Sequence, residues 1–263
     1  MSETVLETEK LDKFFKLGER EVRALSDVSL QVKRGEFVSV MGPSGSGKTT
    51  LLNMLGCLDR PTHGKVAIDG VDITKVPEKK LYETRRNKVG FIFQNFNLLP
   101  YLSAIENVEL PMEGTGKSKD ERRKRVQELL KLVGLSERGE HRPNRLSAGE
   151  QQRVAIARAL ANNPAIILAD EPTGNLDQKT GLEIVRLLGK LTVDQKTTII
   201  MVTHDSRMAS ETERMLFLSD GKLLAKEKEG LLISEKETKC PSCGRKLPED
   251  AEYCPRCGKK LVS

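Results

Sequence analysis

A glycine-rich segment has the residue types and the spacing that hold a chain of phosphates. Residues 42–49 read Gly-Pro-Ser-Gly-Ser-Gly-Lys-Thr, between a predicted buried strand at 37–41 and a predicted helix from about 48 to 58. The glycines let the backbone curl so that successive N–H groups point inward, where Lys48 can reach the outer phosphate oxygens and the Thr49 hydroxyl can ligate Mg²⁺. The predicted phosphate contacts are Gly42, Pro43, Ser44, Gly45, Ser46, Gly47, Lys48, Thr49 and Thr50.

A pair of carboxylates follows a second predicted strand. Residues 166–169 are apolar, and Asp170 and Glu171 come directly after them. Open α/β sheets bind ligands beyond the carboxyl ends of their strands, so we expect Asp170 to hold Mg²⁺ through its water shell. Because side chains alternate along a strand, Glu171 points differently and is free to polarise a water that attacks the terminal phosphate.

Two further polar residues follow predicted strands. Gln94 comes after the strand at 89–93, and His204 comes just after the strand at 198–202. A single polar residue after a strand is usually an ordinary loop residue. Here both fall at the predicted carboxyl edge of the same parallel sheet, so we expect each to reach the terminal phosphate, Mg²⁺ or the attacking water.

The segment 146–152, Leu-Ser-Ala-Gly-Glu-Gln-Gln, opens a helical pattern that ends before Pro164, and two interpretations fit it. Ser147 with Glu150 three residues later forms a capping box, which satisfies the first N–H groups of the helix itself. Alternatively, the small residues around Gly149 leave N–H groups and the positive end of the helix dipole facing an anion. The segment by itself favours the plain cap.

Alternating strand-like and helical runs predict an α/β fold over residues 1–225. Short β-rich runs at 22–25, 28–32 and 66–68 predict a small antiparallel sheet beside the parallel core. Residues from about 96 to 163 predict a helical insert in that core.

Four of the five cysteines form two Cys-x-x-Cys-Gly pairs, after a charged segment at 226–239 that is predicted to be a linker. Four thiolates complete a closed tetrahedral Zn²⁺ site, and a segment as small as 240–261 cannot fold on its core alone. The segment resembles a short zinc ribbon with a structural metal. The predicted zinc ligands are Cys240, Cys243, Cys254 and Cys257.

Composition argues against a nucleic-acid groove and against a membrane span. Lys and Arg number 44 and Asp and Glu 38, for a net charge of +6, but the two signs are interspersed along the chain. This pattern indicates solubility, and we expect no nucleic-acid partner. The acidic N-terminus has no apolar signal region and the longest apolar runs are too short to cross a bilayer, so we expect a cytosolic chain.

The order of these motifs resembles that of the ATP-binding cassette (ABC) ATPases over about residues 5–225: phosphate loop, Gln94, segment 146–152, acid pair, Asp177 in Asn-Leu-Asp, and His204. Within this family, segments such as Ala-Asp-Glu-Pro-Thr-Gly-Asn-Leu-Asp at 169–177 resemble one subgroup. That subgroup contains the ATPases of macrolide exporters and lipoprotein-release systems and the related cell-division ATPase. The resemblance implies a P-loop NTPase core, ATP and Mg²⁺ as ligands, and hydrolysis by two chains arranged head to tail.

The resemblance also implies roles for single residues. An aromatic side chain ahead of the first sheet stacks on adenine, which points to Phe15, although the spacing leaves the adjacent Phe14 open. Ser147 and Gly149 would contact ATP held by the other copy of the chain, and Asp177 would lie across the seam of the dimer. We further expect Mg²⁺ to be held by Thr49, Gln94 and Asp170. The residues expected to act in hydrolysis are Glu171, His204 and Gln94.

Two residues depart from the commonest signature of this family, Leu-Ser-Gly-Gly-Gln. Ala148 replaces the first glycine, keeps its N–H and adds only a methyl group, which a helix accepts. Glu150 replaces the glutamine, and as the third residue of a capping box it can turn back onto the Ser147 N–H. We expect both replacements to be compatible with function.

Together these features predict an ATPase subunit that dimerises on ATP and drives a separate membrane permease from the inner face of the cell membrane, for export of a lipoprotein, peptide or macrolide type. A cell-division type ATPase that transmits force without moving a substrate would carry the same residues, so that alternative stays open. A soluble ABC ATPase acting on DNA or ribosomes is disfavoured, because the chain has no long coiled-coil insert and no second cassette.

Overall fold

A six-stranded sheet carries the predicted phosphate loop and the predicted acids. Its strands in the computed structural model are β3 (Phe37–Met41), β6 (Val89–Phe93), β7 (Ile166–Asp170), β8 (Thr198–Thr203), β9 (Arg214–Ser219) and β10 (Lys222–Leu224), in the order β10-β9-β3-β8-β7-β6. Every neighbouring pair from β9 to β6 is parallel, and β10 returns antiparallel to β9. The α/β fold expected from the sequence is confirmed.

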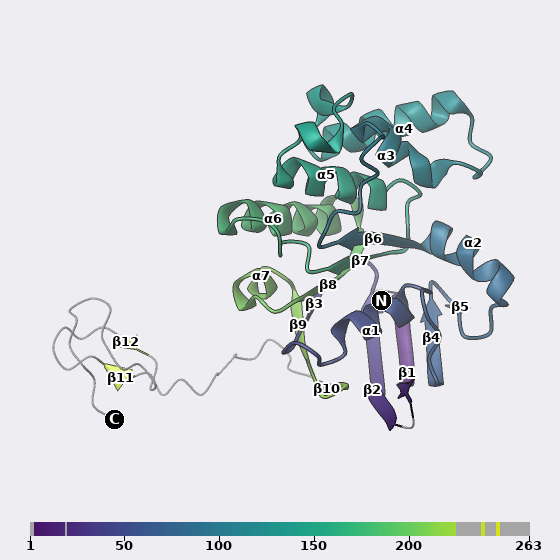
Figure 1. Cartoon of the computed structure of the whole chain (residues 1–263), viewed down its shortest axis with the longest axis vertical. Coiled ribbons are helices and arrows are strands. Elements are labelled where there is room, and N and C mark those ends of the chain that lie inside the picture. The colour runs from purple at the N-terminus through teal and green to yellow at the C-terminus, as the bar shows by residue number, and fades with distance from the viewer. Residues whose placement is uncertain (1–2, 19, 225–237, 240–245, 248–263) are drawn as a thin grey trace. The chain divides into compact units, whose positions relative to one another are not determined.

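The structure describes residues 3–18, 20–224, 238–239 and 246–247, and the chain divides into two units, Met1–Lys226 and Glu227–Ser263. Within the first unit, helices α3 to α6 lie on one side of the six-stranded sheet, and α1 with a second sheet lies on the other (Figure 1).

Each face of the six-stranded sheet has its own apolar core, because alternate residues of a strand point to opposite faces. One set packs under the helices: Phe37, Ile167, Ala169, Ile199 and Met201. The other set packs toward α1 and the second sheet: Val38, Val40, Ile166, Leu168, Ile200 and Val202. The continuous apolar runs that predicted these strands are therefore the result of burial on both faces.

The second sheet is antiparallel, as predicted, but it is larger than the sequence indicated. It consists of β1 (Thr4–Leu17), β2 (Arg20–Lys33), β4 (His63–Ile68) and β5 (Val71–Asp72), in the order β2-β1-β4-β5. The sequence pattern does not predict β1. Its pairing with β2 contains several register shifts and Lys10 has a φ of 44°, so its side chains do not follow the simple alternation of a strand.

The helices are α1 (Lys48–Leu55), α2 (Glu78–Lys88), α3 (Ala104–Glu109), α4 (Lys119–Leu132), α5 (Ala148–Ala159), α6 (Gln178–Gln195) and α7 (Ser206–Ser210). The predicted helix from 48 to 58 is too long by three residues, because the chain turns at Gly56 and Cys57 has a φ of 56°. Helices α3, α4 and α5 each begin with a serine capping box, which explains their sharp starts.

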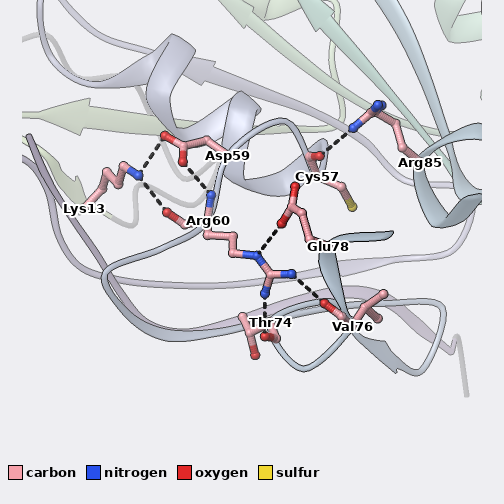
Figure 2. Close-up of polar contacts among 8 residues, drawn as sticks. All are labelled: Lys13, Cys57, Asp59, Arg60, Thr74, Val76, Glu78 and Arg85. Carbon is pink, nitrogen blue, oxygen red and sulfur yellow. Dashed lines mark hydrogen bonds and ion pairs between the residues drawn. The ribbon is translucent and has the colours of Figure 1, made fainter. Parts of the chain in front are cut away.

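A polar network joins the end of α1 to the antiparallel sheet (Figure 2). The Lys13 ammonium on β1 lies 2.7 Å from Oδ2 of Asp59 and donates to the carbonyl of Arg60 at 2.8 Å. The Arg60 guanidinium donates to two backbone carbonyls of the loop before α2 and lies 3.1 Å from Oε2 of Glu78. These contacts fix the phosphate-loop helix against β1 and α2.

The second unit is described only at β11 (Thr238–Lys239) and β12 (Lys246–Leu247), which pair antiparallel. The predicted zinc ligands Cys240, Cys243, Cys254 and Cys257 lie outside the described residues, as does most of the predicted linker. None of the helices in the described ranges combines the length and the apolar character that a bilayer crossing requires.

Gly90 on β6 offers a test of the packing between the sheet and α5. A Cβ at this position would collide with the backbone carbonyl of Ala159 at the end of α5, so Gly90→Ala should lower the free energy of unfolding by about 2 kcal/mol. Gly189 on α6 is the matched control, because its nearest neighbour to an added Cβ is Phe37 at 3.9 Å. Gly189→Ala should raise stability by about 0.5–1 kcal/mol.

Urea unfolding of both variants checks this prediction. Equal stabilities for the two alanine variants would show that α5 does not press on β6 as the structure indicates.

Candidate functional site

A cavity of about 750 Å³ lies at the carboxyl edge of the six-stranded sheet. It is lined by residues of the phosphate loop, by the acid pair after β7, by His204 after β8 and by the turn after β9. The parallel strands end at this edge together, so residues far apart in sequence meet here. The lining residues are Val22, Arg23, Ala24, Ser44, Gly45, Gly47, Lys48, Thr49, Thr50, Asp170, Glu171, Val202, His204, Asp220 and Gly221.

The phosphate loop runs from β3 into α1 and leaves the start of that helix open to an anion. Gly47 is the N-cap of α1, and no side chain caps the helix. Gly47 has a φ of 100°, and a Cβ there would collide with the carbonyl of Ala24, so only glycine fits. The buried Lys48 ammonium donates to the carbonyls of Gly42 and Pro43, both at 2.8 Å, which orients it within the loop.

Asp170 has the environment of a cation ligand. Burial raises the pKa of its carboxyl above the ordinary value, and the negative charge of Glu171 raises it further, while a hydrogen bond from the Thr49 hydroxyl and the charge of Lys48 oppose the shift. A divalent cation between Asp170 and Thr49 would offset both unfavourable effects on the carboxylate. This donor set, one carboxylate and one hydroxyl with room for water, fits Mg²⁺.

Glu171 and His204 form one unit. Nδ1 of His204 lies 2.8 Å from Oε1 of Glu171, and the Glu171 side chain is mostly buried whereas that of His204 is 70% exposed. Glu171 has a φ of 46°, a conformation that few residues other than glycine adopt, and its N–H donates to the carbonyl of Val202 at 3.0 Å. The backbone therefore turns sharply at Glu171 and directs its carboxylate to His204.

Gln94 lies beside this unit but not in the wall of the cavity. Its side chain packs against the loop 171–177: a Cβ on Gly174 would come within 2.7 Å of the Gln94 amide nitrogen. The Asn175 side chain donates to the carbonyl of Gln94 at 3.0 Å. Gln94 therefore follows β6 at the edge of the sheet, as predicted. Its contacts are with Gly174 and Asn175, in the loop that follows Glu171.

Ser147, Gly149 and Asp177 do not line the cavity of their own chain. Ser147 caps α5: its Oγ accepts from the Glu150 N–H at 3.2 Å, and a Glu150 carboxylate oxygen accepts from the Ser147 N–H at 2.8 Å. The other Glu150 oxygen accepts from Arg138 at 3.1 Å, and the pKa of Glu150 is lowered chiefly by the bond from the Ser147 N–H. Asp177 caps α6 through the N–H groups of Lys179 and Thr180.

The two phenylalanines of β1 differ in their surroundings. The Phe14 ring meets the His63 ring edge-on at 6.1 Å and has the Arg23 guanidinium 5.3 Å from its centre. Phe15 is 39% exposed, with the Lys13 ammonium 5.0 Å from its ring centre, and it pairs directly with Val22, a residue of the cavity wall. Directly opposed residues of an antiparallel pair share a face, so the open ring is that of Phe15.

Comparison with known proteins places this geometry in a family. The family model for ABC transporters matches residues 25–174, and the model for a zinc-ribbon domain matches residues 239–261. The chain belongs to the ABC transporter family. It is an ATP-hydrolysing cassette.

The relatives of this cassette are ATP-binding proteins of the same size and longer exporters. It is 52% identical to an uncharacterised ABC transporter ATP-binding protein of Methanocaldococcus jannaschii, MJ0796, over 85% of this chain and 97% of the relative. It is also 49% identical to the macrolide export ATP-binding/permease protein MacB of Bartonella henselae. That match covers 85% of this chain but only 34% of the relative.

Solved structures agree with this assignment. The structure described as a dimeric post-hydrolysis state of the ATP-binding cassette MJ0796 with ADP and Pi matches at a TM-score of 0.77 and 50% identity, over 86% of this chain and 99% of that one. A second dimeric structure of MJ0796 matches at a TM-score of 0.78 and 50% identity, with the same coverage of both chains.

Some residues of the site gave no signal in the sequence. Val22 and Arg23 line the cavity because β2 passes beside the phosphate loop, and Asp220 and Gly221 line it from the turn between β9 and β10. The backbone carbonyl of Ala24 lies against both Gly47 and Gly221, so β2 and the turn after β9 meet at the phosphate loop. A contact made by a backbone carbonyl does not require a particular side chain at residue 24, and the sequence therefore gives no sign of it.

Substitution of the two phenylalanines separates their roles. Phe15→Ala should weaken ATP binding about tenfold, because one lost base–aromatic stack is worth about 1–3 kcal/mol. Phe14→Ala, the matched control on the same strand, should change it less than about threefold. Titration with a fluorescent ATP analogue measures both, and a larger loss for Phe14→Ala would assign the stacking role to that residue instead.

Proposed function

We propose that this chain is the ATPase subunit of an exporter, which dimerises on ATP and drives a membrane permease. The observation that carries the proposal is the 2.8 Å contact between Glu171 and His204 in the wall of the cavity that also holds the phosphate loop. It joins a carboxylate able to accept a proton from water to an exposed imidazole able to contact the terminal phosphate.

The proposed chemistry divides the work among this chain's own residues. Lys48 and the open N-terminus of α1 bind the phosphates, and Phe15 stacks on adenine. Thr49 and Asp170 hold Mg²⁺, assisted by Gln94, and the bound cation offsets the negative charge of the phosphates. Glu171 accepts a proton from the attacking water while His204 keeps the carboxylate in place.

Dimerisation would explain why Ser147, Gly149 and Asp177 do not line the cavity of their own chain. Ser147 is exposed at the start of α5, away from its own chain's cavity. In a head-to-tail dimer, Ser147 and Gly149 would contact the ATP of the other copy, with Asp177 at the seam. The structures of MJ0796, which is half identical to this chain in sequence, are dimeric and so support dimer formation.

A groove of about 500 Å³ beside the cassette's β6 suits a permease segment. Its wall contains Leu58 and Tyr82, which are 47% and 51% exposed, and the rings of Phe91 and Phe93, which stack with centres 5.5 Å apart. The lining also includes three arginines, and it contains no carboxylate. We propose that a cytoplasmic segment of the permease binds here, next to Gln94, and keeps the subunit at the inner face of the membrane.

The relatives suggest a substrate class. Macrolide exporters of the MacB type carry an ATP-binding part similar to this chain, and their names include the permease. We therefore propose export of a macrolide, peptide or lipoprotein type of substrate.

The four cysteines of the second unit are proposed to bind structural Zn²⁺. The match to a zinc-ribbon domain covers Cys240, Cys243, Cys254 and Cys257. Cys57 is not one of them: it is buried in the core of the first unit, and burial raises the pKa of its thiol to about 11.

Glu171→Gln tests the hydrolytic site. The amide cannot accept the proton, so turnover should fall by about 10²–10⁴-fold while ATP still binds, and a stable ATP-dependent dimer should appear in size-exclusion chromatography. Glu128→Gln on the exposed face of α4 is the matched control and should hydrolyse ATP normally. Wild-type turnover in Glu171→Gln would remove this residue from its role.

Substitution in the groove tests the permease interaction. Leu58→Glu and Tyr82→Glu place carboxylates on the proposed contact surface, and each should reduce co-purification with the co-expressed permease about tenfold or more, while the isolated subunit keeps its ATPase activity. Val193→Glu is the control, because Val193 is 73% exposed on α6 and lies outside the groove. Equal recovery of permease by all three variants would contradict the proposed docking surface.

A further inference from the structure

Gln152 is a buried polar residue for which the proposed site has no use. It lies on α5, five residues after Ser147, and its side chain has no exposed surface. Its Nε2 donates to the backbone carbonyl of Pro172 at 2.7 Å. Pro172 is the residue after Glu171, so one hydrogen bond joins α5 to the peptide that carries the proposed general base.

The two ends of this bond belong to different ATP sites in the proposed dimer. Ser147 and Gly149 at the start of α5 would contact the partner's ATP, whereas Glu171 acts on the ATP of its own chain. Gly149 also lies close to the first turn of α6, which follows the loop 171–177, since a Cβ on it would come within 2.7 Å of the Thr180 methyl group. Thr180 in turn donates to Asp177 at 2.5 Å.

The bond resists being broken when α5 moves. Both Gln152 Nε2 and the Pro172 carbonyl are buried, and a buried polar group that loses its partner is strongly destabilised. The Oε1 of Gln152 already has no hydrogen-bond partner among the described residues, so the side chain has no second bond in its present position. A shift of α5 therefore either displaces Pro172 or leaves further buried groups unpaired.

Glu171 is sensitive to such a displacement. Its backbone has a φ of 46° and is held between the Val202 carbonyl on one side and Pro172 on the other. Its carboxylate must also keep the 2.8 Å contact with His204. A small movement of Pro172 changes the direction of the Glu171 side chain, because the two residues share a peptide bond.

We propose that Gln152 is a positioning residue which transmits the docking of α5 on the partner's ATP to Glu171 of its own site. It makes hydrolysis at one site depend on closure at the other. This inference rests on the proposed head-to-tail dimer and concerns how its two sites communicate.

The test compares Gln152→Met with Thr192→Val. Methionine keeps the size of glutamine and removes the hydrogen bond. Thr192 on α6 is the matched control, since it is buried and its hydroxyl donates to the Gly189 carbonyl at 2.7 Å, far along the helix from the loop 171–177. Each substitution is also combined with Glu171→Gln so that dimer formation is measured without turnover.

Gln152→Met should lower kcat about tenfold and reduce the Hill coefficient for ATP toward that of independent sites, while the doubly substituted chain still forms the ATP-dependent dimer with affinity within about threefold of Glu171→Gln. Thr192→Val should leave kcat and the Hill coefficient at wild-type values. The inference is overturned if Gln152→Met keeps the wild-type kcat and Hill coefficient, or if Thr192→Val reproduces its loss. Failure of Glu171→Gln itself to dimerise would instead refute the dimer.

Discussion

Parallel pairing of β3, β8 and β7, with β6 beside them, determines where the chemistry of this chain can occur. Strands that run in the same direction end at the same edge, so the phosphate loop meets the acid pair and His204 there although more than a hundred residues of sequence separate the loop from both. The apolar cores on both faces fix the strands, and the charged residues that this sheet brings to the cavity lie at or beyond its strand ends.

The starts of two helices differ in a way that fits the proposed sharing of the site between two chains. Helix α1 begins at Gly47 without a side-chain cap, so its N–H groups can take the phosphates of the chain's own ATP. Helix α5 caps itself through Ser147 and Glu150 and leaves the serine hydroxyl at the surface. The charge that Glu150 brings is paired with Arg138 at 3.1 Å, which explains how the glutamate is accepted at this position.

Much of this arrangement could be predicted from the sequence, because buried parallel strands are apolar throughout and the phosphate loop needs a defined set of residue types. For these reasons the sequence predicts β3, β7 and β8, the strands whose carboxyl ends lead to Gly42, Asp170 and His204. Strand β1 was missed because its bulges break the alternation of side chains. The cavity wall from β2 and the Gln152–Pro172 bond depend on contacts with backbone carbonyls, and such contacts leave no pattern in the residue types.

The central claim is that one chain cannot complete an ATP site. Mixing two inactive variants measures this most directly: Lys48→Ala, which loses its own phosphate contacts, and Ser147→Arg, which blocks the contact offered to a partner. A mixed dimer has one intact site, formed by the phosphate loop of the second variant and the α5 start of the first. The account predicts ATPase activity in the mixture that neither variant shows alone, at a level about tenfold below the wild-type rate per intact site, because α5 of the second variant has no partner ATP on which to dock. A mixture as inactive as its components, or a Ser147→Arg chain with full activity by itself, would contradict it.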